Sequence, residues 1–215
     1  LLGLHVIRGD WVPISELARS TPEEGKASTS SARMGFFWRS AGLLSPYRAA
    51  SPSKPFSLEV SVCLGAGVIR ATFSLRGPTA ILSLPAPTTA MRRDELWRHT
   101  CFEAFVQHAG GYLEYNLSPS TEWAAYGFTG YRDGMADLDV DAPAIRVTRD
   151  EHLLSVQADL ALPAGIVPTR IGLSAVIEEG SGRRSYWALR HPPGEATDFH
   201  HPDCFALELP PPAAP

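Results

Sequence analysis

Short apolar runs separated by turn residues follow one another from Ser57 almost to the end of the chain. Turn signals such as Gly110-Gly111 and Pro192-Pro193-Gly194 recur about every 8 to 12 residues, a spacing typical of sandwiches and barrels. Helices are predicted only at residues 92–97 and 14–19, and neither is long enough to cover a parallel sheet. The pattern therefore predicts an all-β, antiparallel sandwich of the jelly-roll or immunoglobulin-like kind.

We expect about eleven strands, because period-two alternation and bounding turn residues mark that many runs. The runs are LEVSVCL, VIRATFSL, TAILSL, HTCFEAFVQ, YLEYNL, TEWAAYGF, AIRVTRD, HLLSVQADL, TRIGLSAVI, RRSYWAL and CFALEL. Glycines between the first two runs predict a hairpin, and TAILSL is predicted to add a third strand.

The first 55 residues are expected to lie outside the fold. They include STPEEGKASTSSAR, a segment too polar to offset the entropy of ordering. We predict that residues 1–55 are a disordered leader or a mis-annotated start, with Met34 as an alternative start. Residues 56–210 are then expected to form one domain, and residues 211–215 are a Pro/Ala-rich tail. The 44% of hydrophobic residues in the chain suffices for one substantial core.

Charge and hydropathy exclude several classes of partner. The net charge is -4 and no block of Lys or Arg could follow a phosphate backbone, so nucleic acid is not expected. No apolar run approaches the roughly 20 residues that span a bilayer, and no cleavable signal is present, which predicts a cytoplasmic protein without a membrane partner. Cys63, Cys101 and Cys204 form no CxxC pair and are predicted to be reduced. No protein partner is identified.

A carboxylate stands in the middle of one predicted strand, CFEAFV. Alternation places Glu103 on the same face as Cys101 and Phe105, opposite the core-facing residues. Trp97 lies six residues before Glu103, at the strand entrance, and Trp187 in RRSYWALR could occupy the equivalent face of another strand. Aromatic rings beside a fixed carboxylate are typical of a site for a flat ligand such as a sugar ring.

Each of these residues also has a structural interpretation. Trp97 and Trp187 could be core residues, as Trp usually is in a sandwich. Glu103 must be exposed, paired or functional, because an unpaired buried charge is costly, and a salt bridge to Arg98 or Arg132 would satisfy it.

Three segments carry a resemblance to a known family: LWRHTCFEAFV, YLEYNLSPSTEWAAYGFTGYRDGM and YWALRHPPGEATDFHHPDCFALEL. They resemble bacterial DOMON-like proteins, relatives of the family 9 carbohydrate-binding modules (CBM9), over residues 57–209. In the sugar-binding relatives a slot lies between two Trp rings and is closed by a Glu and an Arg. The resemblance implies that Trp97, Glu103 and Trp187 occupy matching places, with Arg132 of GYRDGM as the cation.

The resemblance implies a non-catalytic module that binds a saccharide or an amino sugar. Two alternatives stay open: a structural or protein-interaction domain without a small ligand, and a haem-binding redox module. Haem would need axial ligands, for which Met91, Met135, His99 and His152 are available in no dictated spacing.

Other polar groups give weaker signals. Asn116 could hydrogen-bond a sugar hydroxyl or satisfy the backbone of the Ser-Pro turn that follows it. HHPDC, at residues 200–204, contains metal-binding residue types, but Pro202 interrupts them and a structural loop is favoured. The run Asp137, Asp139 and Asp141 resembles the start of a calcium loop but lacks its glycine and closing Glu.

No nucleophile elbow, phosphate loop or metalloprotease helix is present in the sequence. We therefore predict that the protein is not an enzyme, and we expect no cofactor, calcium and haem being the open alternatives.

Overall fold

The computed structural model describes residues 4–7, 10–13, 36–194 and 196–211. The chain divides into two compact units, Leu1–Arg33 and Met34–Pro215. In the first unit, β1 (Leu4–Ile7) and β2 (Asp10–Pro13) pair as an antiparallel hairpin. The rest of the predicted leader between Pro13 and Phe36 lies outside the described residues.

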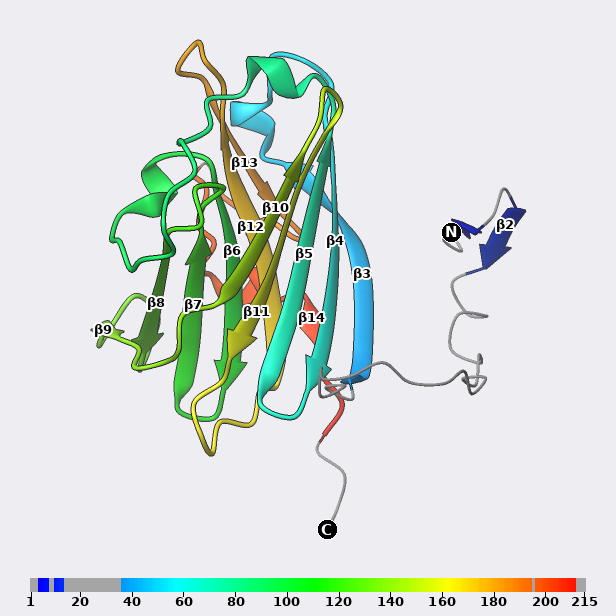
Figure 1. Cartoon of the computed structure of the whole chain (residues 1–215). Helices are drawn as coiled ribbons and strands as arrows, with labels where there is room; N and C mark the ends of the chain where they lie inside the picture. Colours follow the sequence, from blue (N-terminus) through cyan, green and yellow to red (C-terminus); the bar gives the residue numbers. More distant parts are fainter. Residues whose placement is uncertain (1–3, 8–9, 14–35, 195, 212–215) are drawn as a thin grey trace, which may run out of the picture. The chain divides into compact units, whose positions relative to one another are not determined.

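The second unit contains one antiparallel sheet of twelve strands in the described part of the chain (Figure 1). Its order is β10-β11-β5-β4-β3-β13-β12-β6-β7-β8-β9, and β14 pairs with β12. The predicted all-β antiparallel fold is confirmed. The strands are β3 (Phe36–Pro46), β4 (Ser57–Gly65), β5 (Val68–Arg76), β6 (Cys101–His108), β7 (Gly111–Leu117), β8 (Trp123–Phe128), β9 (Ala136–Asp137), β10 (Ala144–Arg149), β11 (Leu153–Ala161), β12 (Arg170–Glu178), β13 (Arg184–Ala188) and β14 (Leu207–Glu208).

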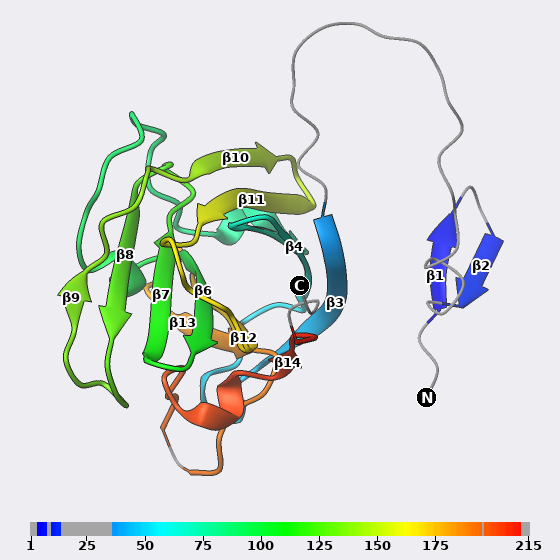
Figure 2. The same cartoon turned by 90° about the horizontal axis from the view of Figure 1, so that it is seen from below.

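The sheet curls so that its two halves face each other, as Figure 2 shows along the strands. One half holds β10, β11, β5, β4 and β3, and the other holds β13, β12, β6, β7, β8 and β9. Inward side chains of both halves form the main core, where the rings of Phe73 on β5 and Phe102 on β6 lie 5.1 Å apart. The alternating burial of β4, β5 and β11 is the period-two pattern that the sequence shows.

Strand β3 lies inside the predicted leader and corrects that boundary. It pairs with β4 from Leu44↔Leu58 to Phe36↔Gly65 and with β13 at Ser45 and Pro46. Leu44 is almost fully buried in the main core. The average composition of residues 1–55 predicts a leader because the segment before Met34 is polar. The apolar run FFWRSAGLL within residues 1–55 nevertheless forms a strand.

Two further expectations are corrected. The run TAILSL forms no strand; it contains the short 3-10 helix η3 (Thr79–Ile81), followed by a single bridge from Leu82 to Glu179. The predicted helix at 92–97 is reduced to the 3-10 turn η4 (Leu96–Arg98). Pro78 and Pro85 flank the first segment, and proline lacks the backbone N–H that a strand ladder uses. In the second, Glu95 has φ 62°, outside the right-handed helical region, so the turn begins only at Leu96.

The outer face of the second half carries a second apolar cluster. It includes Phe105 on β6, Tyr126 on β8 and Phe205, which follows the 3-10 turn η5 (Pro202–Cys204). The segment after β13 lies close to this face because Gly172 has no side chain; a Cβ there would lie 2.9 Å from the carbonyl oxygen of Cys204. β12 is consequently buried on both faces.

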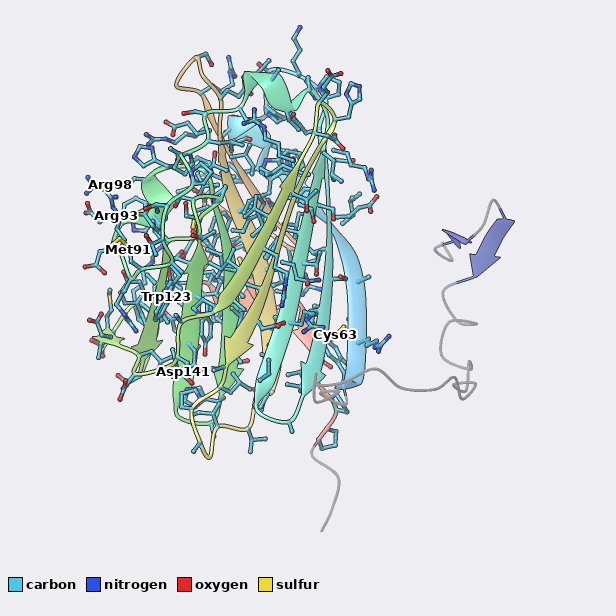
Figure 3. The ribbon with its side chains drawn as sticks, viewed as in Figure 1. Cys63, Met91, Arg93, Arg98, Trp123 and Asp141 are labelled. Carbon is cyan, nitrogen blue, oxygen red and sulfur yellow. The ribbon has the colours of Figure 1, made fainter. Side chains whose placement is uncertain are left out.

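Segment 91–98 also reaches the outer face, beside β8. The backbone N–H of Trp123 donates to Met91 O at 3.0 Å, and that of Arg93 donates to Trp123 O at 2.9 Å. Figure 3 shows Met91, Arg93 and Arg98 together at the left, beside β8, whereas Cys63 on β4 lies at the right of the view. Among the described residues, no helix is long and apolar enough to cross a membrane.

Candidate functional site

A cleft of about 740 Å³ opens on the outer face of the second half of the sheet. Its floor is made of alternate side chains of β6, β7, β8 and β12, and its walls come from segments 94–97, 132–137 and 197–200 and from β13. The lining residues are Asp94, Glu95, Trp97, Glu103, Phe105, Glu114, Tyr126, Phe128, Arg132, Met135, Asp137, Val176, Tyr186, Thr197, Phe199 and His200.

Two carboxylates lie on the floor. Glu103 of β6 pairs in register with Asn116 of β7, and Glu114 of β7 pairs with Phe105. Glu103 and Glu114 are therefore diagonal neighbours on one face of the hairpin. Both are over nine-tenths buried, at 3% and 6% exposure, which is unusual for side chains that carry charge.

Few groups compensate this buried pair. Ser174 Oγ donates to Glu103 Oε2 at 2.8 Å, and Asn116 Nδ2 donates to Glu114 Oε1 at 2.7 Å. Burial, together with the neighbouring charge of Glu114, raises the pKa of Glu103 to about 8. Burial also raises the pKa of Glu114. At neutral pH, Glu103 is thus mainly protonated in the empty cleft.

A chain of hydrogen bonds runs along one side of the floor. The Arg132 backbone N–H donates to Tyr112 Oη at 3.2 Å, and Tyr112 Oη lies 2.8 Å from His200 Nδ1. His200 Nε2 lies 3.8 Å from Glu114 Oε2. Burial, and next the charge of Arg132, lowers the pKa of His200 to about 4, so His200 is neutral at pH 7. It brings no charge that could balance Glu114.

The turn that follows β8 positions Arg132. Arg132 has φ 52°, a left-handed conformation uncommon for residues other than glycine, within a turn bridged by Gly130 and Asp133. Its Nη2 donates to Asp198 Oδ1 at 2.8 Å. Arg132 therefore lines the cleft while its guanidinium is held by the carboxylate of Asp198, between the lining residues Thr197 and Phe199.

Segment 94–97 presents Trp97, which is 49% exposed and lines the cleft, with the Arg98 guanidinium 5.4 Å from the centroid of its ring. Glu95 precedes it with φ 62° and pairs with Arg98 at 2.6 Å, which fixes the η4 turn. Tyr126 Oη donates to Asp94 Oδ1 at 2.7 Å, and both residues line the cleft. Trp97 thus shares the cleft with aromatic and acidic groups.

Among the residues proposed from the sequence, Trp97, Glu103 and Arg132 all line the cleft. The contribution expected of Trp187 is corrected: Trp187 is 2% exposed and belongs to the main core, with Nε1 donating to Ser185 Oγ at 2.9 Å. Because Ser174 on β12 pairs with Ala188, the even-numbered residues of β13 share the face of Glu103. Tyr186 thus lines the cleft where Trp187 was expected.

Asn116 supports the site from within the sheet. It is 1% exposed and does not line the cleft; its amide donates to Glu114, and its Oδ1 lies 3.6 Å from Cys101 Sγ. The alternative of a salt bridge at Glu103 is also corrected, since Arg98 pairs with Glu95 and Arg132 with Asp198.

Several cleft residues were not among the predicted site residues, notably Glu114, Tyr186, Phe199 and His200. Glu114 could have been found, because a hairpin turning at Gly110-Gly111 places it diagonal to Glu103. The others depend on how β13 and the loop after it fold back, for which the sequence holds no periodic signal.

The metal-binding residue types of HHPDC, the segment interpreted as a structural loop, have different surroundings. His200 lines the cleft, whereas Cys204 Sγ donates to Asp198 O at 3.2 Å. Within the described residues, no group of three or more His, Cys, Asp or Glu side chains is placed to hold a metal ion.

No protein-family model matches the chain, and no curated protein matches it. Among solved structures, it is similar to a Bacteroides uniformis protein described as a "putative carbohydrate-binding protein". The TM-score is 0.59 at 9% identity, over 78% of this chain and 84% of that one. It also matches a family 9 carbohydrate-binding module from Caldicellulosiruptor kristjanssonii in complex with cellotriose, with TM-score 0.42 and 12% identity over 71% and 75% of the two chains. The first likeness shows a shared fold.

Proposed function

We propose that the protein is a non-catalytic carbohydrate-binding module and that its saccharide lies in the outer-face cleft. The observation that carries this proposal is the composition of the cleft, which is lined by the half-exposed Trp97, by further aromatic side chains and by the buried Glu103. Aromatic rings cover the apolar faces of a sugar, and a few fixed polar groups select its hydroxyl pattern.

The fold supports the same proposal, since the Bacteroides uniformis protein of the same fold is described as carbohydrate-binding. Arg132 lies on the wall beside Glu103 and supplies donors for hydroxyl oxygens. Membership of the DOMON-like proteins and a cytoplasmic location remain predictions.

Calorimetric and Trp-fluorescence titration of the full chain with neutral oligosaccharides tests the proposal. We expect saturable binding that falls at least tenfold in Trp97→Ala and in Glu103→Gln. Val147→Ala is the matched control for loss of an exposed apolar side chain, because Val147 is 36% exposed on β10 in the other half of the sheet.

Binding that persists unchanged in both cleft variants would place the ligand elsewhere and contradict the proposal. Absence of binding to every neutral and amino saccharide tried would contradict it as well, and would favour a protein-interaction domain.

A further inference from the structure

Resting on the proposed function, we propose that the preferred saccharide carries a free amino group and that its ammonium lies between Glu103 and Glu114. The charges of the cleft, and the hydrogen bonds that the two carboxylates lack, favour a ligand of this class.

The charge of the lining is predominantly negative. Five carboxyl groups line the cleft, and even with Glu103 protonated the other four outnumber the one guanidinium, that of Arg132, among the lining residues that the structure describes. Arg132 is already paired with Asp198. The cleft therefore attracts a cation more strongly than it attracts a neutral or acidic ligand.

The carboxylates of the walls lie near cations or accept a hydrogen bond from Tyr126, whereas each floor carboxylate accepts a single hydrogen bond from a neutral side chain. Glu95 pairs with Arg98, Asp137 lies 3.9 Å from Arg92, and Asp94 accepts from Tyr126. On the floor, Glu103 and Glu114 each accept one hydrogen bond from a neutral side chain. In the described part of the chain, no hydrogen bond reaches Glu103 Oε1, and Glu114 Oε2 has only His200 at 3.8 Å.

An ammonium group fits this arrangement. It has three donors and a positive charge, so it can donate to both carboxylates at once and offset their mutual repulsion. A hydroxyl can accept a hydrogen bond from protonated Glu103 and donate one to Glu114, but it carries no charge, so it neither favours ionisation of Glu103 nor offsets the negative charge of the pair. The floor thus distinguishes an amino sugar from its hydroxyl counterpart.

Proton release accompanies such binding. Because Glu103 holds a proton in the empty cleft near neutral pH, an arriving ammonium favours the ionised carboxylate and displaces that proton. Around Glu103, Cys101 of β6 is a thiol whose pKa burial raises, and Ser174 of β12 is uncharged. Arg132 stays charged, and His200 is neutral above pH 5. Affinity for the protonated amine should accordingly rise from pH 6 to pH 7.

Three β-1,4-linked disaccharides, of glucose, glucosamine and N-acetylglucosamine, form a matched series that differs only at the second carbon. Calorimetry on the full chain at pH 6, in two buffers of different ionisation enthalpy, measures affinity and proton release together. We expect the glucosamine disaccharide to bind at least tenfold more tightly than the other two and to release protons. In Glu103→Gln and in Glu114→Gln, the preference should fall to less than threefold, with circular dichroism unchanged.

The outcomes separate the two proposals. Equal or tighter binding of the glucose disaccharide would overturn the amine inference and leave the carbohydrate-binding proposal standing. A preference for the amine that survives both variants would also overturn the inference, because the ammonium would lie elsewhere. Absence of binding by all three sugars would contradict both proposals.

Discussion

At the scale of single residues, the molecule tolerates a buried carboxyl group where a sandwich usually has an apolar or exposed side chain. Strand alternation places Glu103 on the outer face of β6, and the walls of the cleft then cover it, so that it is only 3% exposed. One hydrogen bond from Ser174 does not offset the loss of hydration, and the group stays protonated to about pH 8.

This shift predicts how stability depends on pH. In the unfolded chain Glu103 ionises near its ordinary pKa of 4.5, whereas in the folded chain its pKa is about 8. Between these values the folded chain holds a proton that the unfolded chain has released, so Glu103 lowers the free energy of unfolding as pH rises, by up to about 1.4 kcal/mol per pH unit. Below pH 4.5 both states are protonated and the effect vanishes.

Glu103→Gln removes this titration but keeps the shape of the side chain and an acceptor for Ser174. We expect the variant to be more stable than the natural chain at pH 8, with the difference shrinking by a few kcal/mol toward pH 5. Urea unfolding at both pH values measures it. A difference that is the same at pH 5 and pH 8 would show that Glu103 is already ionised in the folded chain.

The two tryptophans of the predicted site should behave in opposite ways. Trp187→Ala opens a cavity in the main core and should lower the free energy of unfolding by about 3–5 kcal/mol. Trp97→Ala should change it by no more than about 0.5 kcal/mol, because half of the Trp97 ring already faces solvent. Equilibrium urea denaturation compares them, and equal losses would contradict the placement of Trp187.

At the scale of elements, β3 connects the two halves of the curled sheet. It is the neighbour of β4 on one side and of β13 on the other, so the ladder would be interrupted between them without it. The other side chains of residues 38–46 are half-buried or exposed, whereas Leu44 is buried in the main core.

Adjacent leucines test whether β3 belongs to the core. Leu44→Ala, at 1% exposure, should cost about 2–5 kcal/mol of unfolding free energy, while Leu43→Ala, at 62% exposure, should cost about 0.5 kcal/mol or less. Thermal and chemical unfolding of the two variants make the comparison. A small effect at Leu44 would mean that residues 36–46 add little to the fold, as the sequence analysis expected.

The sequence predicts individual strands well and their partners poorly. Ten of the eleven predicted runs overlap observed strands, because alternation and turn residues are local signals. The face to which Trp187 points depends on the register between β12 and β13, which long-range pairing sets. Glu103 and Trp97 could be identified from the local pattern of one run. Tyr186 could not, because its place in the cleft depends on the register between β12 and β13.

At the scale of the whole molecule, the sheet curls without closing, and in the described part of the chain the path of paired strands ends at β10 and at β9. β9 is only two residues long, which limits pairing with another chain. β10 is longer and largely exposed, and it carries Arg146 and Arg149. Charged side chains on an open edge oppose pairing with a second copy.

Arg146→Val should therefore increase self-association, because it leaves a longer apolar stretch on a free edge. The matched variant Val147→Lys adds charge to the same strand and should leave the chain at least as soluble. Light scattering during storage at high concentration compares them with the natural chain. Equal scattering from all three would indicate that the β10 edge is protected in some other way.

The strands β6, β7 and β12 send alternate side chains into the core and onto the cleft floor, while the walls come largely from loops at 94–97, 132–137 and 197–200. The fold therefore fixes the positions of the floor side chains, because a change of strand register that moved them would also disrupt the core. The loops are under no such constraint. Exchange of these three loops on an unchanged sheet should therefore change which ligand the cleft prefers, much as antibodies vary hypervariable loops on a common framework.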